Sequence, residues 1–101
     1  MVNEVLKILD KAVVTDAVVY DMREKTPFYD YSIICSVSSS RQGAACVEYL
    51  KDDAQKIGLN VRGYNSSPTS GWFLVDLGEI VVHIFVGDER KRYNLDGMYA
   101  N

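Results

Sequence analysis

The residue pair with the clearest capacity for chemistry is Asp76 and His83, the latter being the single histidine of the chain. Both lie in runs of strand-forming residues that flank Gly78-Glu79, and a two-residue loop with glycine first is typical of a type II′ β-hairpin. In that hairpin Asp76 faces Val81 and Leu74 faces His83, so the carboxylate and the imidazole become diagonal neighbours within hydrogen-bond reach. A carboxylate can orient a histidine that activates a nucleophile. Nothing in the sequence links a serine to this pair, which favours a structural or interface histidine.

Alternation along the hairpin sorts its side chains onto two faces. The first face is wholly apolar and is expected to join the core; it comprises Phe73, Val75, Leu77, Ile80, Val82 and Ile84. The second face is mixed and comprises Trp72, Leu74, Asp76, Val81, His83 and Phe85. We expect the mixed face to be half-covered by another element or offered to a partner. Trp72 fits a core position and an interface anchor equally well.

The serine run at positions 36–40, broken by Val37, could bind a phosphate, because a helix N-terminus with hydroxyl groups suits an anion. Loops of that kind usually need glycine where Val37 stands, and no lysine follows as it does in a P-loop. A helix cap is the favoured interpretation, with Ser39 accepting from the amide of Gln42.

Metal-dependent nucleotidyl transfer needs carboxylates that alternate along a strand, and the chain has no Asp-x-Asp. Asp52-Asp53 would point in different directions on a helix. Cys35 and Cys46 are expected to be small buried hydrophobes, since no metal-ligand spacing is present. We therefore predict no metal and no cofactor. Arg90-Lys91-Arg92 beside Asp88-Glu89 is interpreted as a solvated face, with a phosphate or RNA contact as the minor alternative.

The 101 residues suggest one domain, residues 1–101. A net charge of −3 argues against an electrostatic grip on nucleic acid phosphates, and no direct sequence-specific binding of nucleic acid is expected. The charge suits a basic protein partner, or no charged partner at all. No apolar run reaches membrane-spanning length and no signal-peptide pattern is present, so a cytoplasmic protein is expected.

Hydrophobic periodicity and turn residues divide the chain into eight helices and strands, joined by loops and turns. The expected elements are a helix at 3–12 capped by Asn3, strands at 17–22 and 31–37, a helix from Ser39 to Ile57 stopped by Gly58, a strand at 59–64, a loop at 65–71, the two hairpin strands, a charged turn at 88–92 and a short helix at 93–100 capped by Asn94. The order αββαβββα predicts an α+β domain with a five-stranded mixed sheet, whose two faces three short helices need not cover fully.

Together these motifs resemble the Iojap family, the bacterial ribosomal silencing factors. The residues that carry the resemblance are Asp30-Tyr31, Ile33-Ile34, Ser39-Ser40-Arg41-Gln42, Trp72 through Glu79, Val81-Val82-His83-Ile84-Phe85, and Arg90 through Leu95. The resemblance implies a nucleotidyltransferase-like fold without catalysis. It also implies a translation repressor that binds the large ribosomal subunit through ribosomal protein fourteen, blocks joining of the small subunit and lowers translation when nutrients are scarce.

On this hypothesis the partner-binding residues are Trp72, Asp76, Leu77, Glu79 and His83. Trp72 and Leu77 would supply desolvated contact area, with Leu77 left exposed by its place beside the turn, and the two carboxylates would meet basic residues of the partner. One alternative is a nucleotide-binding or nucleotidyltransferase-like enzyme. Another is a structural homodimer that pairs through the mixed face. The tail has Met98-Tyr99 where the family usually has Leu-Trp, so partner affinity could differ in this chain.

Overall fold

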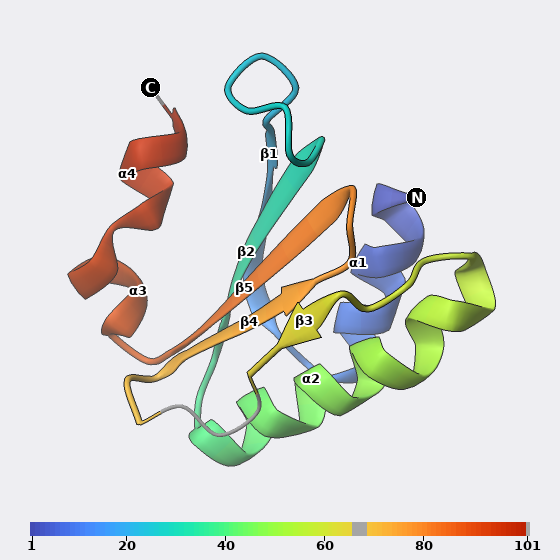
Figure 1. Cartoon of the computed structure of the whole chain (residues 1–101). Helices are drawn as coiled ribbons and strands as arrows, with labels where there is room; N and C mark the ends of the chain where they lie inside the picture. Colours follow the sequence, from blue (N-terminus) through green and yellow to red (C-terminus); the bar gives the residue numbers. More distant parts are fainter. Residues whose placement is uncertain (66–68, 101) are drawn as a thin grey trace.

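Three layers build the molecule, with the sheet in the middle (Figure 1). The computed structural model describes residues 1–65 and 69–100. Helices α1 (Val2–Lys11) and α2 (Ser40–Ala54) cover one face of the sheet, and the short helices α3 (Glu89–Tyr93) and α4 (Leu95–Ala100) lie against the other. The chain order matches the predicted αββαβββα, except that the last helix is divided in two.

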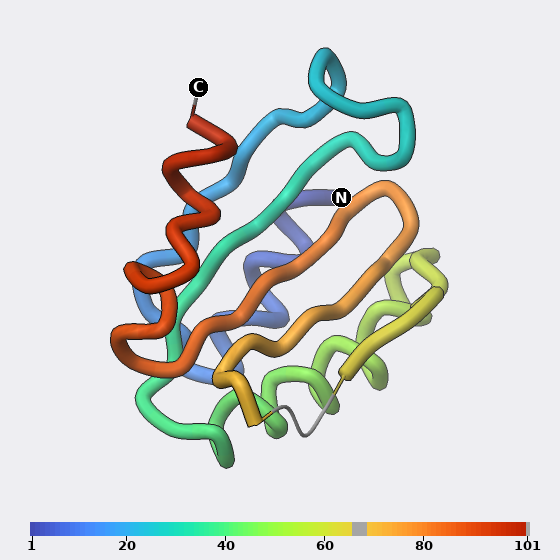
Figure 2. The backbone as a smooth tube through the Cα atoms, turned by 60° about the vertical axis from the view of Figure 1, so that its left-hand side comes forward, coloured from blue at the N-terminus to red at the C-terminus, as the bar shows by residue number. Residues whose placement is uncertain are grey.

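The sheet contains five strands in the order β1-β2-β5-β4-β3. These strands are β1 (Thr15–Asp21), β2 (Tyr31–Val37), β3 (Gly63–Tyr64), β4 (Trp72–Asp76) and β5 (Ile80–Val86). The central pair β2 and β5 is parallel, and the other three pairs are antiparallel. Figure 2 shows β5, in orange, running between β2 of the first hairpin and β4. The predicted α+β class with a mixed five-stranded sheet is confirmed.

Several predicted boundaries are wrong by a few residues. Helix α1 already begins at Val2, so Asn3 lies within the first turn and caps nothing. Strand β3 comprises two residues instead of 59–64, because only Gly63 and Tyr64 pair with β4. Helix α2 ends at Ala54 and continues as the 3₁₀ turn η1 (Gln55–Ile57). The predicted stop at Gly58 is confirmed, since this residue is left-handed with φ of +85°.

Two further predictions concern the loop at 65–71 and the C-terminal region. Residues 66–68 of that loop lie outside the described residues. The expected turn at 88–92 is instead mostly helical. Asn94 is the C-cap of α3 and directly precedes α4; its φ of +50° places it in the left-handed region, where it separates the two helices. Asparagine tolerates this conformation better than most residues.

The main core lies between the sheet and the α1–α2 layer, and it contains the apolar face of the hairpin. Cys35 and Cys46 are buried there as free thiols, as predicted, and burial raises the pKa of both. Helix α2 approaches β4 so closely that a Cβ atom added to Gly43 would overlap the ring of Phe73 unless that ring moved. Glycine therefore permits the close approach of the two elements.

A second, smaller core lies on the opposite face of the sheet, under α3 and α4. Ile34, Phe85 and Leu95 are its buried residues, and the side chains packed around them are Tyr20, Trp72, Tyr93 and Tyr99. The mixed face of the hairpin is thus covered at the Phe85 end, in agreement with the expectation that another element covers half of it.

Candidate functional site

The β4–β5 hairpin holds the predicted site residues in the predicted register. Leu74 pairs with His83 and Asp76 with Val81. The backbone N–H of Leu77 donates to the carbonyl of Ile80 at 2.9 Å and closes a two-residue turn. Gly78 has a φ of +90° and Glu79 has no positive φ, which agrees with a type II′ turn. The local residue types therefore specify both the register and the turn.

The Asp76 carboxylate forms a hydrogen bond within the turn that follows it. Its Oδ1 accepts a hydrogen bond from the backbone N–H of Gly78 at 2.8 Å. No hydrogen bond joins Asp76 to His83 within residues 1–65 and 69–100, so the predicted Asp–His pair is not formed. The reason is that each group has a nearer partner: a turn amide for the carboxylate, and Trp72 for the imidazole.

Leu77 is a core residue. Its side chain is 2% exposed and packs in the main cluster, so the expectation that it stays exposed beside the turn is wrong. Alternation alone had placed it on the apolar face, and a two-residue turn is too tight to lift it away from that face.

Trp72 and His83 form the floor of the candidate site. The indole Nε1–H donates to Nδ1 of His83 at 3.1 Å, which places the imidazole proton on Nε2. Nε2 is buried and finds no partner among the described residues. Burial lowers the pKa of His83 to about 4, so the ring is neutral near pH 7. A neutral histidine with its acceptor nitrogen occupied has no free lone pair with which to act as a general base.

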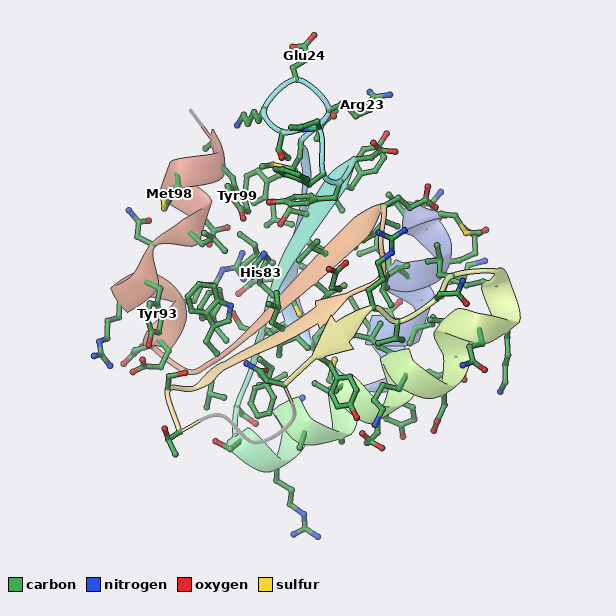
Figure 3. All side chains as sticks on the ribbon, viewed as in Figure 1. Arg23, Glu24, His83, Tyr93, Met98 and Tyr99 are labelled. Carbon is green, nitrogen blue, oxygen red and sulfur yellow. The ribbon has the colours of Figure 1, made fainter. Side chains whose placement is uncertain are left out.

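Trp72 is half-buried and packs at the border of the small core, so its core environment is realised in part. Its ring is 5.2 Å from that of Phe85 and 4.9 Å from that of Tyr93. Figure 3 shows His83 on the sheet with Tyr93 and Tyr99 of the C-terminal helices on the same side. The rings of His83 and Tyr99 are 6.1 Å apart, edge to face.

Beyond the C-terminal helices the mixed face opens into a groove of about 450 Å³. It is lined by Phe28, Tyr29, Arg62, Leu74, Asp76, Gly78, Val81 and His83. The most prominent of these is Phe28, which is 82% exposed on the loop between β1 and β2. Its backbone N–H donates to Oγ1 of Thr26 at 3.2 Å. An exposed phenylalanine over a half-apolar groove suits docking of another molecule, and the lining contains no activated nucleophile.

Phe28 is a residue that the sequence reasoning missed. It falls in the polar connection 23–30, next to Pro27, and an aromatic residue in a loop that otherwise reads as solvent-exposed was the available signal. The predicted site had carboxylates as its charged groups, Asp76 and Glu79. In the structure, Arg62 also lines the groove beside Asp76 and the exposed Glu79. The groove can therefore offer apolar area together with charges of both signs.

The serine-rich junction is occupied by its own hydrogen bonds. Ser39 Oγ accepts from the backbone N–H of Gln42 at 3.1 Å, which confirms the predicted cap. The Gln42 side chain accepts from the N–H and hydroxyl of Ser38, both at 2.8 Å, and donates to the carbonyls of Ala12 and Val13. The groups that would hold a phosphate thus tie α1 to α2 instead.

A cavity of about 920 Å³ adjoins this junction, and Arg90 lines it. The predicted solvated face is wrong for Arg90. Its Nε and Nη2 donate to the Asp96 carboxylate at 3.0 and 3.1 Å, and its Nη1 donates to Asp16 O at 2.7 Å and Ser36 Oγ at 3.0 Å. Asp96 also accepts from Tyr20 at 2.6 Å. This clamp fastens α3 and α4 to the sheet and leaves the guanidinium little capacity for a ligand. Residue spacing gave no signal of it.

Within the described part of the chain, no three histidine, cysteine or acidic side chains come together as metal ligands. Across the same residues, none of the helices has the length and apolar character to cross a membrane.

Comparison with known proteins agrees with this picture. A family model described as ribosomal silencing factor during starvation matches residues 1–101. A ribosomal silencing factor of Haemophilus influenzae is 36% identical over 100 residues, covering 99% of this chain and 98% of the relative. A ribosomal silencing factor of Bacillus subtilis is 36% identical over 86 residues, covering 85% and 73%. The chloroplastic protein Iojap of Zea mays is 33% identical over 87 residues, covering 86% and 38%.

Solved structures show the same fold. A crystal structure of a Bacillus halodurans protein has a TM-score of 0.84 at 30% identity, covering 97% of this chain and 91% of that one. A Chromobacterium violaceum protein has a TM-score of 0.91 at 21% identity, covering 99% and 83%.

Proposed function

Because this chain belongs to the family of ribosomal silencing factors, we propose that it represses translation by binding the large ribosomal subunit through ribosomal protein fourteen. The bound protein would then sterically block the small subunit from joining the large one. The Haemophilus influenzae and Bacillus subtilis relatives are named as silencing factors and not as enzymes. Repression by occupying a surface requires a docking face and no reaction, and the groove on the mixed face provides such a surface.

The observation that carries the proposal is the groove beside Phe28. A phenylalanine that is 82% exposed has nearly all of its apolar area available for burial against a partner. Burying a phenylalanine side chain is worth about 1.5–3 kcal/mol. Leu74 adds apolar area to the groove, and the half-buried Trp72 lies two residues away on the same strand. Asp76 and the exposed Glu79 would meet basic side chains on the partner.

The predicted binding set is accordingly reduced to the residues that a partner can reach. Trp72, Asp76 and Glu79 remain contact residues in this proposal, and Phe28 is added as the main apolar anchor. Leu77 and His83 are only 2% and 6% exposed, so in this proposal they position other residues and do not contact the partner. Leu77 packs the hairpin against the core, and His83 accepts the hydrogen bond that orients the indole of Trp72.

Co-sedimentation with purified large and small ribosomal subunits tests the proposal. We expect the wild-type protein to pellet with the large subunit alone. Phe28→Ala should weaken this binding about ten- to hundredfold, the loss that corresponds to the burial above. Phe28 is a better probe than Trp72, because Trp72→Ala also removes packing against Phe85 and Tyr93.

Tyr49→Ala is the matched control, since Tyr49 is an exposed aromatic residue on α2, on the opposite side of the sheet. Calorimetric titration with purified ribosomal protein fourteen then identifies the partner. Absence of pelleting with either subunit would contradict the proposed function. Equal weakening by Phe28→Ala and Tyr49→Ala would remove the groove from the interface.

A further inference from the structure

The cavity of about 920 Å³ beside Arg90 lies at the carboxyl ends of the two parallel strands, β2 and β5. Helix α2 follows β2 on one face of the sheet, and α3 follows β5 on the other (Figure 1). In open sheets with parallel strands, ligands bind outside the carboxyl ends at a point where the following helices diverge in this way. The N–H of Gly87 donates to the carbonyl of Val37 at 3.0 Å, which joins the two strand ends, and both residues line the cavity.

Unusual backbone conformations collect around this cavity. Among residues 1–65 and 69–100, the non-glycine residues with positive φ are Val13, Asp16 and Asn94, at +58°, +52° and +50°, and all three line it. Aspartate and asparagine tolerate the left-handed region, but a β-branched residue such as Val13 is a genuine outlier there. Strained residues of this kind gather at ligand sites and are held by the surrounding structure. The shape of the cavity is therefore maintained against local backbone preference.

The charged side chains that remain free in the cavity carry both signs. Arg90 is occupied by its clamp with Asp96. Lys91 is exposed, and its ammonium group has no hydrogen bond or ion pair within the described part of the chain. The exposed carboxylates of Asp16 and Asp88 likewise accept no hydrogen bond from any described residue. One free cation and two free carboxylates thus face the same space.

We infer that this cavity binds a small zwitterion, namely a free α-amino acid. The carboxylate of the ligand would meet the ammonium group of Lys91, and its ammonium group would meet Asp16 and Asp88. Val13, which is 71% exposed, offers apolar surface to the side chain of the ligand. A specific site of this kind needs only a few convergent polar groups in a cavity of roughly 300–1,000 Å³.

The same residues disfavour the other ligands that a polar cavity could take. A polyanion such as a nucleoside triphosphate would meet three lining carboxylates, those of Asp16, Asp88 and Asp96, with Lys91 as the one cation that the clamp leaves free. A divalent cation is not favoured either, since the described residues bring no three acidic, histidine or cysteine side chains together as ligands. A ligand with one charge of each sign fits best.

This site is separate from the groove on the mixed face. The groove lies around Val81 and His83 near the start of β5, whereas the cavity lies beyond the last residue of that strand, Val86. A ligand in the cavity leaves the groove open. The inference therefore does not rest on the proposed function, and either can fail without the other.

Titration of the isotope-labelled protein with each standard L-amino acid, followed by backbone amide chemical shifts, tests the inference. We expect at least one of them to give saturable shifts at Gly87, Asp88 and Lys91 below about 10 mM, while the amide of Leu74 in the groove stays unchanged. The amide of that amino acid lacks the carboxylate, and its N-acetyl derivative lacks the ammonium group. Each should bind about tenfold more weakly, because each loses one charged hydrogen bond.

Two variants locate the binding site. Lys91→Met and Asp88→Asn should each weaken binding about tenfold, for the same reason. Both leave the fold intact, since Lys91 is exposed and Asp88 forms no side-chain cap on α3. The matched control is Arg92→Met, at an exposed cation of the same helix that does not line the cavity.

Three results would overturn the inference. The first is the absence of saturable shifts with every amino acid up to about 10 mM. The second is a response of these amides to inorganic phosphate and to no amino acid, which would assign the cavity to an anion. The third is amino acid binding that Lys91→Met and Asp88→Asn leave as strong as Arg92→Met does, which would place the ligand elsewhere.

Discussion

Replacing Arg90 with methionine should loosen the attachment of α3 and α4 to the sheet. Methionine keeps most of the length of the arginine side chain but removes all of its hydrogen-bond donors. Four bonds of 2.7–3.1 Å disappear, two to the Asp96 carboxylate and one each to Asp16 and Ser36. Among residues 1–65 and 69–100, the Asp96 carboxylate then keeps Tyr20 as its one side-chain donor.

The expected loss follows from how deeply the pair is buried. Exposed ion pairs contribute about 0–1 kcal/mol, and breaking a fully buried pair costs about 3–5 kcal/mol. The Arg90 and Asp96 side chains are 16% and 27% exposed, between these limits. We therefore expect the free energy of unfolding to fall by about 2–3 kcal/mol. For a domain of this length that lowers Tm by about 10–15 °C.

The pH dependence gives the same interaction a second signature. The hydrogen bonds from Arg90 hold the pKa of Asp96 below its usual value. The resulting stability is present above the unfolded pKa of about 4 and is lost as pH falls through the lower folded value. Arg90→Met should lack this acid-dependent part.

Urea unfolding followed by circular dichroism measures the loss. Arg92→Met is the matched control, because Arg92 lies on the same helix and pairs with Glu89 at 3.1 Å with its own side chain 71% exposed. It should cost less than about 0.5 kcal/mol. Equal effects of the two substitutions, or a loss below about 0.5 kcal/mol for Arg90→Met, would refute the view that a half-buried clamp fastens the C-terminal helices.

Two more predictions concern the floor of the site and the helix–sheet contact. Because burial lowers the pKa of His83 to about 4, the unfolded chain binds a proton between pH 6.5 and 4 that the folded chain does not, and stability should fall by about 3 kcal/mol across this window. In His83→Gln, unfolding measured from pH 7 to 4 should lack that slope; an unchanged slope would contradict it. Gly43→Ala should lower the free energy of unfolding in urea by about 1–3 kcal/mol, because the added methyl group crowds Phe73. Gly63→Ala is the control and should cost under about 1 kcal/mol, because a Cβ atom there meets no atom within 4 Å. Equal losses for the two variants would show that the contact between Gly43 and Phe73 relaxes freely.

Prediction from sequence worked best where the determinants are local. The hairpin register, the glycine at its turn, the apolar face and the Ser39 cap each depend on residues close together in the chain. β2 was predicted with its observed bounds, because its β-branched and aromatic residues are bounded by a serine run. Such patterns specify an element without knowledge of its neighbours.

Prediction failed where the partner of a side chain lies far away in sequence. The tie between Arg90 and Ser36 spans 54 residues, and no periodicity encodes it. Prediction also failed at shorter range, because His83 was paired with Asp76 on the ground that both share a face, whereas its hydrogen bond comes from Trp72. Phe28 could be located in a loop, but only the fold places that loop at the rim of the groove.

The strand order has a consequence for the time course of folding. The centre of the sheet is the parallel pair of β2 and β5, and the residues that pair, such as Ile34 with His83, are separated by about half of the chain. Contacts of that span cost loop-closure entropy before they contribute any stability, which slows folding. The β1–β2 and β4–β5 hairpins can form locally, but each leaves an open edge until β5 docks on β2. During synthesis, the edge of β2 that pairs with β5 therefore stays unpaired until residues 80–86 have been added.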